Sequence, residues 1–209
     1  LTMGGTIVTL GPTAVRTRMD PRAVDLASLA LPVWAAGLLA AVAGALAGHM
    51  RAVAAGLAVV GLAAAAGIAY PLARAAMRKG PSEYGSWSMC LGTAWILVGV
   101  AVVAHHAWAA GTGEQLRAAN LPWLPIIGAG GLGQVFIGAL TYLMPVVIGG
   151  GPRAVRVGVG ALEAAAPMRE AARNAALVLL AAATASQAPV AARLATACWA
   201  VVLATYLAD

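Results

Sequence analysis

Residues 27–48 read ASLALPVWAAGLLAAVAGALAG, and residues 52–73 read AVAAGLAVVGLAAAAGIAYPLA. Neither stretch contains a charged residue, and each is as long as the roughly 20 apolar residues that carry an α-helix across a bilayer. Alanine and scattered glycine suit helices that pack closely in lipid, because small side chains let two backbones approach each other. The two stretches therefore predict a pair of neighbouring membrane-spanning helices.

The composition of the whole chain agrees with these two stretches. Of its 209 residues, 62% are hydrophobic and only 10% are charged, and the mean hydropathy is +0.87. A soluble domain is nearer half apolar and a quarter charged, and a disordered chain lacks such long apolar runs. A membrane β-barrel would show alternating segments of about ten residues. The sequence thus predicts an all-α fold, a polytopic bundle of transmembrane helices.

We expect about seven spans, the first of them truncated. They cover residues 1–15, 27–48, 52–73, 87–110, 121–149, 171–187 and 190–208. Apolar sequence begins at Leu1 and continues almost to Asp209. We therefore interpret residues 1–209 as a single integral-membrane domain that belongs to a longer chain.

Along the chain, loops with many basic residues alternate with loops that hold few, and this alternation is an independent check on the predicted spans. The loops after the first, third and fifth spans hold ten of the 13 basic residues, namely Arg16, Arg18, Arg22, Arg74, Arg78, Lys79, Arg153, Arg156, Arg169 and Arg173. The other connections hold Arg51, Arg117 and Arg193. Because basic loops stay in the cytoplasm, the chain is expected in the plasma membrane with its C-terminus cytoplasmic. The net charge of +6 then needs no nucleic-acid partner.

All three histidines lie at the expected outer ends of spans. His49 closes the second span, and His105 and His106 lie in the last turns of the fourth. One interpretation is incidental, since histidine costs little at a wet helix end and Trp108 fits an interfacial anchor. The other is a cofactor site, since imidazole ligates haem iron and copper. Adjacent side chains on a helix diverge by about 100°, so at most one of His105 and His106 would bind, and we favour His105 as the deeper and better shielded.

A stripe of four residues marks the span at 121–149. Gly130, Gln134, Gly138 and Tyr142 recur every fourth residue, which places them on one face of a helix. Polar groups in hydrocarbon face the bundle interior. We expect Gln134 and Tyr142 to form hydrogen bonds inside the bundle, either as helix-packing contacts or as part of a functional site.

Other chemical signals are few. Every carboxylate is expected in a loop or at a helix end, Glu170 included, which argues against a proton-coupled transporter. Motifs such as HExxH, CxxC and CxxCH are absent from the sequence. Cys90 and Cys198 each lie in an apolar run, and we expect two buried thiols, with a disulfide only if their helices touch.

Two segments resemble a known family. Residues Thr2–Met19, TMGGTIVTLGPTAVRTRM, and Gln134–Pro152, within GQVFIGALTYLMPVVIGGGPRAVR, are similar to the membrane region of an actinobacterial family of multicopper oxidases. That family resembles copper nitrite reductases and carries periplasmic cupredoxin domains after its helices. The helices are distantly similar to haem-copper oxidase subunit I.

The resemblance implies a function for the parent protein. In the family a histidine-containing motif precedes the first segment, and here Leu1 begins just after that position. That histidine or His49 would supply a partner ligand for haem or copper. Three hypotheses follow: the membrane domain of a copper-dependent oxidoreductase with a periplasmic cupredoxin domain or electron donor as partner, a non-enzymatic anchor or assembly module, and a small-solute transporter or haem-type sensor.

Overall fold

The structure is a computed structural model that describes residues 21–78, 80, 83–148, 157, 160, 163, 165–186 and 191–208. Its principal elements are the helices α2 (Pro21–Leu46), α3 (Met50–Ala64), α4 (Tyr70–Arg78), α5 (Tyr84–Ala109), α6 (Gly113–Asn120), α7 (Leu124–Ile127), α8 (Gln134–Ile148), α10 (Ala166–Ser186) and α11 (Ala191–Leu207). Two π-helical stretches, η1 (Ala65–Ala69) and η2 (Gly128–Gly133), join α3 to α4 and α7 to α8. The span predicted at residues 1–15 lies outside the described residues.

Four helices in the described ranges are long and apolar enough to cross a membrane. They are Asp25–Leu46, Met50–Arg78, Tyr84–Ala109 and Leu124–Thr141. Each overlaps one of the predicted spans, and together they indicate a helical membrane protein. The predicted number of about seven spans is not confirmed by these four.

The remaining two predicted spans correspond to α10 and α11. The structure begins α10 at Ala166, a few residues before the predicted edge of the span. In the structure the helix continues back through Arg169 and Glu170.

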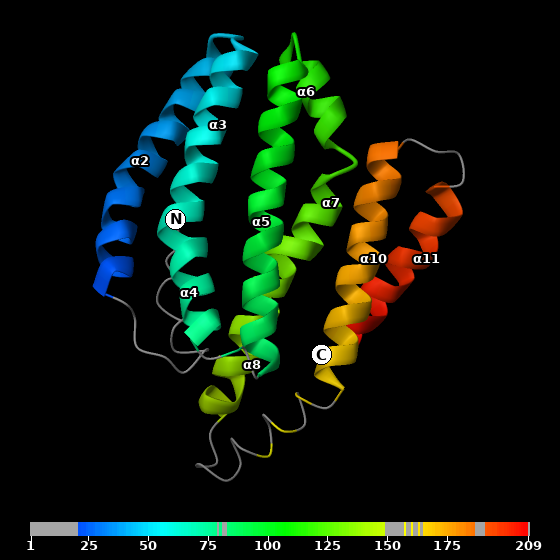
Figure 1. The fold of residues 1–209 in the computed structure, drawn as a ribbon. Coiled ribbons are helices and arrows are strands. Elements are labelled where there is room, and N and C mark those ends of the chain that lie inside the picture. Colours follow the sequence, from blue (N-terminus) through cyan, green and yellow to red (C-terminus); the bar gives the residue numbers. More distant parts are fainter. Residues whose placement is uncertain are drawn as a thin grey trace.

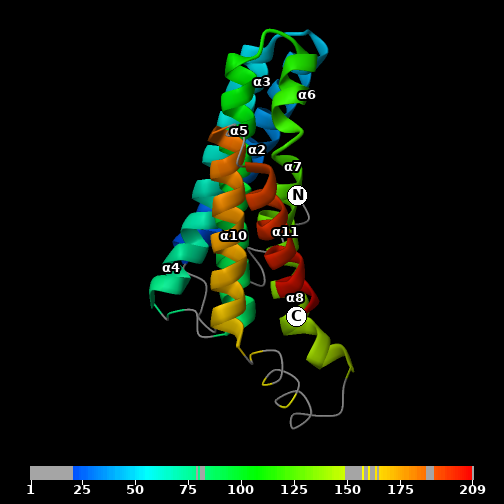
Figure 2. The same ribbon diagram turned by 90° about the vertical axis from the view of Figure 1, so that its right-hand side faces the viewer.

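The helices run side by side along one direction (Figure 1). The turn between α2 and α3 and the helix α6 lie at one end of the bundle, at the top of Figure 1, and the C-terminal end of α10 points toward that end. The helices α10 and α11 lie next to each other (Figure 2), and α10 contacts α5. At the turn between α2 and α3, Gly48 has a φ of 72°, a conformation that glycine adopts without strain.

Glycines set the closest helix contacts, as the composition suggested. A Cβ atom built on Gly85 of α5 would lie 2.9 Å from the backbone oxygen of Gly138 in α8, and the reverse distance is 2.8 Å. Any larger residue at either position would push the helices apart. The α5–α8 pair is thus fixed by direct backbone contact, which brings the side chains around it into register.

Large apolar side chains cover the outside of the bundle. Leu39 is 70% exposed, Leu46 86% and Leu62 71%. A soluble protein rarely exposes apolar residues in such contiguous bands. These faces of α2 and α3 are compatible with contact to the lipid bilayer.

Candidate functional site

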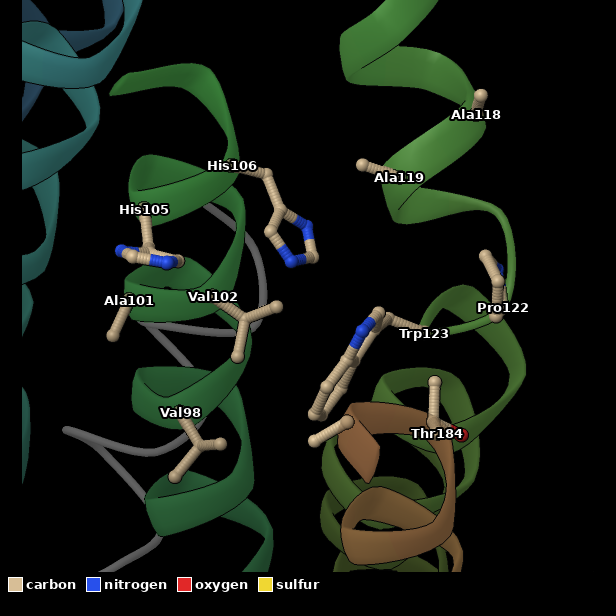
Figure 3. A pocket seen from close by; sticks show the side chains of 11 residues that line it. Val98, Ala101, Val102, His105, His106, Ala118, Ala119, Pro122, Trp123 and Thr184 are labelled. Carbon is tan, nitrogen blue, oxygen red and sulfur yellow. The ribbon is translucent and has the colours of Figure 1, made fainter. Parts of the chain in front are cut away.

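A cleft of about 630 Å³ opens at the end of the bundle that holds the histidines. We call it the histidine cleft. Its wall on α5 is formed by Val98, Val102, His105 and His106, and the opposite side by Trp123 and the end of α10 at Thr184 (Figure 3). The volume lies within the range of small-molecule sites, roughly 300–1,000 Å³.

The helix α6 holds the side of the cleft that faces His106. It begins after Thr112, whose hydroxyl accepts a hydrogen bond from the backbone N–H of Gln115. This N-cap fixes the first turn of a short helix. The last residue of the helix, Asn120, is thereby placed opposite α5.

His106 is the histidine that the structure orients. Its Nδ1 lies 2.7 Å from Oδ1 of Asn120. An amide oxygen only accepts hydrogen bonds, so Nδ1 carries the hydrogen and Nε2 of the neutral ring keeps its lone pair. The ring projects from α5 toward Trp123 (Figure 3), and the two ring centroids are 6.2 Å apart in an edge-on arrangement.

His105 differs from the expectation for it. Its side chain is exposed, whereas that of His106 is half-buried, so the prediction that His105 is the better shielded is wrong. The reason lies in the next helix, since α6 covers the face of α5 that carries His106. The two imidazole centroids are 6.0 Å apart.

His49 is at the same end of the bundle but does not line the cleft. Its side chain is exposed, and its Nδ1 lies 2.8 Å from the carbonyl oxygen of Ala47 in the preceding turn. Within the described ranges, no three His, Cys, Asp or Glu side chains gather as a metal site would require. A copper centre with three protein ligands therefore does not fit this part of the chain.

A second group of polar side chains lies between α5, α8, α10 and α11. We call it the polar cluster. It contains Tyr84, Ser88, Trp95, Gln134, Glu170, Arg173, Asn174 and Thr205. Burying so many polar groups is costly unless each has partners.

Arg173 forms the centre of the polar cluster and is fully buried. Its Nη1 donates to the hydroxyl of Tyr84 at 2.9 Å. Its Nε and Nη2 donate to the hydroxyl and the carbonyl of Thr205 at 3.2 and 3.1 Å. The guanidinium also lies 4.0 Å from the ring centroid of Tyr206, so an aromatic face adds to its stabilisation.

Glu170 supplies the negative charge that Arg173 needs. Its Oε1 is 3.6 Å from Nη1 of Arg173 and accepts a hydrogen bond from the hydroxyl of Ser88. Its Oε2 accepts from Nδ2 of Asn174 at 3.1 Å. The pair is neutral overall, which is how a membrane protein tolerates buried charges.

Gln134 connects the cluster to α8. It is fully buried and exchanges two hydrogen bonds with Asn174, of 3.0 and 3.3 Å. Asn174 Oδ1 also accepts from the indole N–H of Trp95 at 2.9 Å. The side chain of Tyr142, the other polar member of the predicted stripe, lies outside the described part of the chain.

The sequence prediction was wrong about Arg173, which it placed in a basic loop, whereas Arg173 is a buried side chain of α10. Glu170 lies near the N-terminal end of α10, as predicted, and is also buried. The charges were counted without regard to the pair that they form with each other and to the partners of that pair on other helices. The spacing of Glu170, Arg173 and Asn174 by three and four residues, which shares one helix face, was the available signal.

The same correction affects the argument about transport. The argument against a proton-coupled transporter rested on carboxylates at exposed positions, and Glu170 is a buried carboxylate, so that argument is weaker. The two cysteines are free thiols, with Cys198 buried and Cys90 half-buried.

Comparison of the chain with models of protein families, with curated proteins and with solved structures found no match. The histidine cleft and the polar cluster are therefore the features of the molecule that bear on its function.

Proposed function

We propose that this chain is the membrane domain of a copper-dependent oxidoreductase of the multicopper oxidase and nitrite reductase type. In this proposal it anchors a periplasmic copper domain and relays electrons to it at the outer membrane face. The observation that carries the proposal is His106, a histidine held by an amide partner in an open cleft. Such a second hydrogen bond on the other ring nitrogen is characteristic of histidines that ligate metals.

The proposal includes a seven-span arrangement in the plasma membrane. Helices α10 and α11 would be the sixth and seventh spans, and the chain would end in the cytoplasm. Three features support it: the alternation of basic loops, the direction of α10, whose C-terminal end points toward the end of the bundle that holds the α2–α3 turn and α6 in Figure 1, and the 21-residue length of α10. The histidine cleft then opens toward the periplasm.

Haem fits the cleft better than copper does. One axial histidine is enough to hold a haem iron, and Nε2 of His106 is available for that role. The apolar walls at Val98 and Val102 and the Trp123 ring would contact a flat macrocycle. A haem bound there would supply one-electron transfer, while Asn120 holds the imidazole in the orientation and tautomer that ligation requires.

An absorption spectrum of the protein purified from membranes tests this proposal. We expect a Soret band that disappears in His106→Ala. The band should persist in the control His49→Ala, because His49 is also a histidine at the same end of the bundle but does not line the cleft. His105→Ala should keep the band as well. A wild-type protein purified without haem would contradict the relay and leave only the anchoring role.

The polar cluster favours a second candidate, a non-enzymatic anchor or assembly module. Both carboxylate oxygens of Glu170 are engaged by neighbouring side chains, Oε1 by Ser88 and Arg173 and Oε2 by Asn174. A carboxylate held in this way suits a structural contact more than proton transport. The spectrum described above separates this candidate from the relay.

A further inference from the structure

The helix α10 differs from the four helices that are apolar enough to cross a membrane unaided. Its 21 residues are long enough, since an α-helix rises 1.5 Å per residue and a bilayer core is about 30 Å thick. However, Arg169, Glu170 and Arg173 all lie in its first half. Charged residues strongly oppose the transfer of an isolated helix into lipid.

Contacts with protein groups offset the cost of placing these charges in lipid. Arg173 is fully buried and Glu170 is 5% exposed, so both face protein in the structure. The groups that meet this face of α10 come from earlier helices, with the hydroxyl of Ser88 on α5 and the amide of Gln134 on α8. The segments that hold these two partners, Tyr84–Ala109 and Leu124–Thr141, are apolar enough to insert by themselves.

The helix α11 completes the site. Thr205 offers Arg173 both its hydroxyl and its carbonyl oxygen. Apolar side chains pack beside the polar cluster: Leu177 and Leu180 of α10 lie in one core cluster with Trp95 of α5 and Val202 of α11. These contacts add packing but do not compensate any charge. Alone, the hairpin α10–α11 keeps the contacts of Arg173 with Glu170 and Thr205 but loses the hydrogen bonds to Tyr84, Ser88 and Gln134. The helices α5 and α8 contain no Asp, Glu, Lys or Arg, so they carry no such cost.

We propose that the polar cluster is the docking contact that carries α10 and α11 into the membrane. The apolar spans insert first, and α10 enters only by placing Glu170, Arg173 and Asn174 against Ser88, Trp95 and Gln134. This inference rests on the seven-span arrangement proposed above, in which the end of α10 reaches the periplasm.

Labelling of an introduced cysteine measures the insertion of α10 directly. Ser186 is exposed at the end of α10, so Ser186→Cys, made in the full chain with Cys90→Ala and Cys198→Ala, reports whether this end is outside. The probe is a membrane-impermeant maleimide added to intact spheroplasts. A matched reporter, Gly113→Cys in the same background, follows the outer end of α5.

The test variant combines Ser88→Ala with Gln134→Leu and leaves α10 itself unchanged. We expect the ratio of outward to inward Ser186→Cys sites to fall about tenfold, as the loss of three interhelical hydrogen bonds implies. Labelling of Gly113→Cys should remain unchanged. Adding Glu170→Leu and Arg173→Leu removes the two buried charges of α10, leaves Arg169 in its first turn, and should restore the labelling of Ser186→Cys.

The outcomes separate this inference from the proposed topology. If Ser186→Cys is not labelled from outside in the otherwise unchanged chain, the seven-span arrangement is wrong and the docking inference falls with it. If it is labelled equally with and without Ser88 and Gln134, the topology stands and the docking inference is overturned. If the variant that also carries Glu170→Leu and Arg173→Leu does not regain the labelling of Ser186→Cys, the docking inference is overturned as well.

Discussion

At the scale of single residues, the buried charge of Arg173 is the most demanding feature of the molecule. Its guanidinium is fully buried, and the carboxylate of Glu170 lies 3.6 Å away. Removal of one member of such a pair leaves the other charge without compensation, which costs more than the pair contributes. The stability of the bundle should therefore depend on Glu170 far more than on an exposed carboxylate.

We predict that Glu170→Gln lowers the free energy of unfolding by about 3 kcal/mol, because it leaves the Arg173 charge buried alone. Unfolding of the purified protein in detergent, followed by circular dichroism, measures the change. The matched control is Glu114→Gln on α6, where the side chain is exposed and an effect within about 0.5 kcal/mol is expected. Equal effects of the two substitutions would contradict the buried pair.

For Gln134 we predict a smaller loss. Gln134→Leu keeps similar bulk and removes two hydrogen bonds to Asn174, each worth roughly 0.6 kcal/mol in a membrane protein, so about 1 kcal/mol is expected. Thr141→Val on the same helix is the control, since Thr141 donates only to the carbonyl of Ile137 one turn earlier. A loss of bound haem with unchanged folding would instead give Gln134 a functional role.

At the scale of elements, the contact of α5 with α8 is set by glycine rather than by large side chains. We predict that Gly138→Ala destabilises the fold by about 1–3 kcal/mol through overpacking, because the new Cβ would lie 2.8 Å from the backbone oxygen of Gly85. Gly128→Ala lies in the same continuous helix with nothing within 4 Å of its Cβ, so its thermal transition should be unchanged or slightly raised, because alanine favours the helix over glycine. If both substitutions lower the transition equally, the close contact with Gly85 is not the cause.

Some of the elements could be predicted from the sequence, and others could not. Charge-free runs predicted α2 and the α3–α4 helix, because the period and length of an apolar helix are local properties. The polar cluster was predicted in part: Gln134 was expected to form hydrogen bonds inside the bundle and does so with Asn174. The burial of Glu170 and Arg173 was missed, because Ser88 and Tyr84, which contact them from α5, lie about 80 residues or more away in the sequence. The histidine cleft was predicted in part: His105 and His106 were named, but the hydrogen bond from His106 to Asn120 depends on how α6 folds back onto α5.

At the scale of the whole molecule, the two sites lie at different depths of one bundle. Arg74 and Arg78 lie at the opposite end of the bundle from the histidine cleft, as the proposed topology requires. We predict that Met77→Cys, at a position where the side chain is 78% exposed, is labelled by an impermeant maleimide only after the membrane is opened. Gly113→Cys should be labelled in intact spheroplasts. Labelling of both from the same face would contradict the proposed arrangement.

The neutrality of the Glu170–Arg173 pair has a consequence for the energised membrane. An elementary charge moved across the bilayer responds to the transmembrane voltage by about 2.3 kcal/mol per 100 mV. Because the two opposite charges lie 3.6 Å apart, the electric field acts on them in opposite directions and exerts almost no net force. In the proposed arrangement, α10 can thus carry a buried arginine whose charge, paired with Glu170, adds almost no net response to the transmembrane voltage.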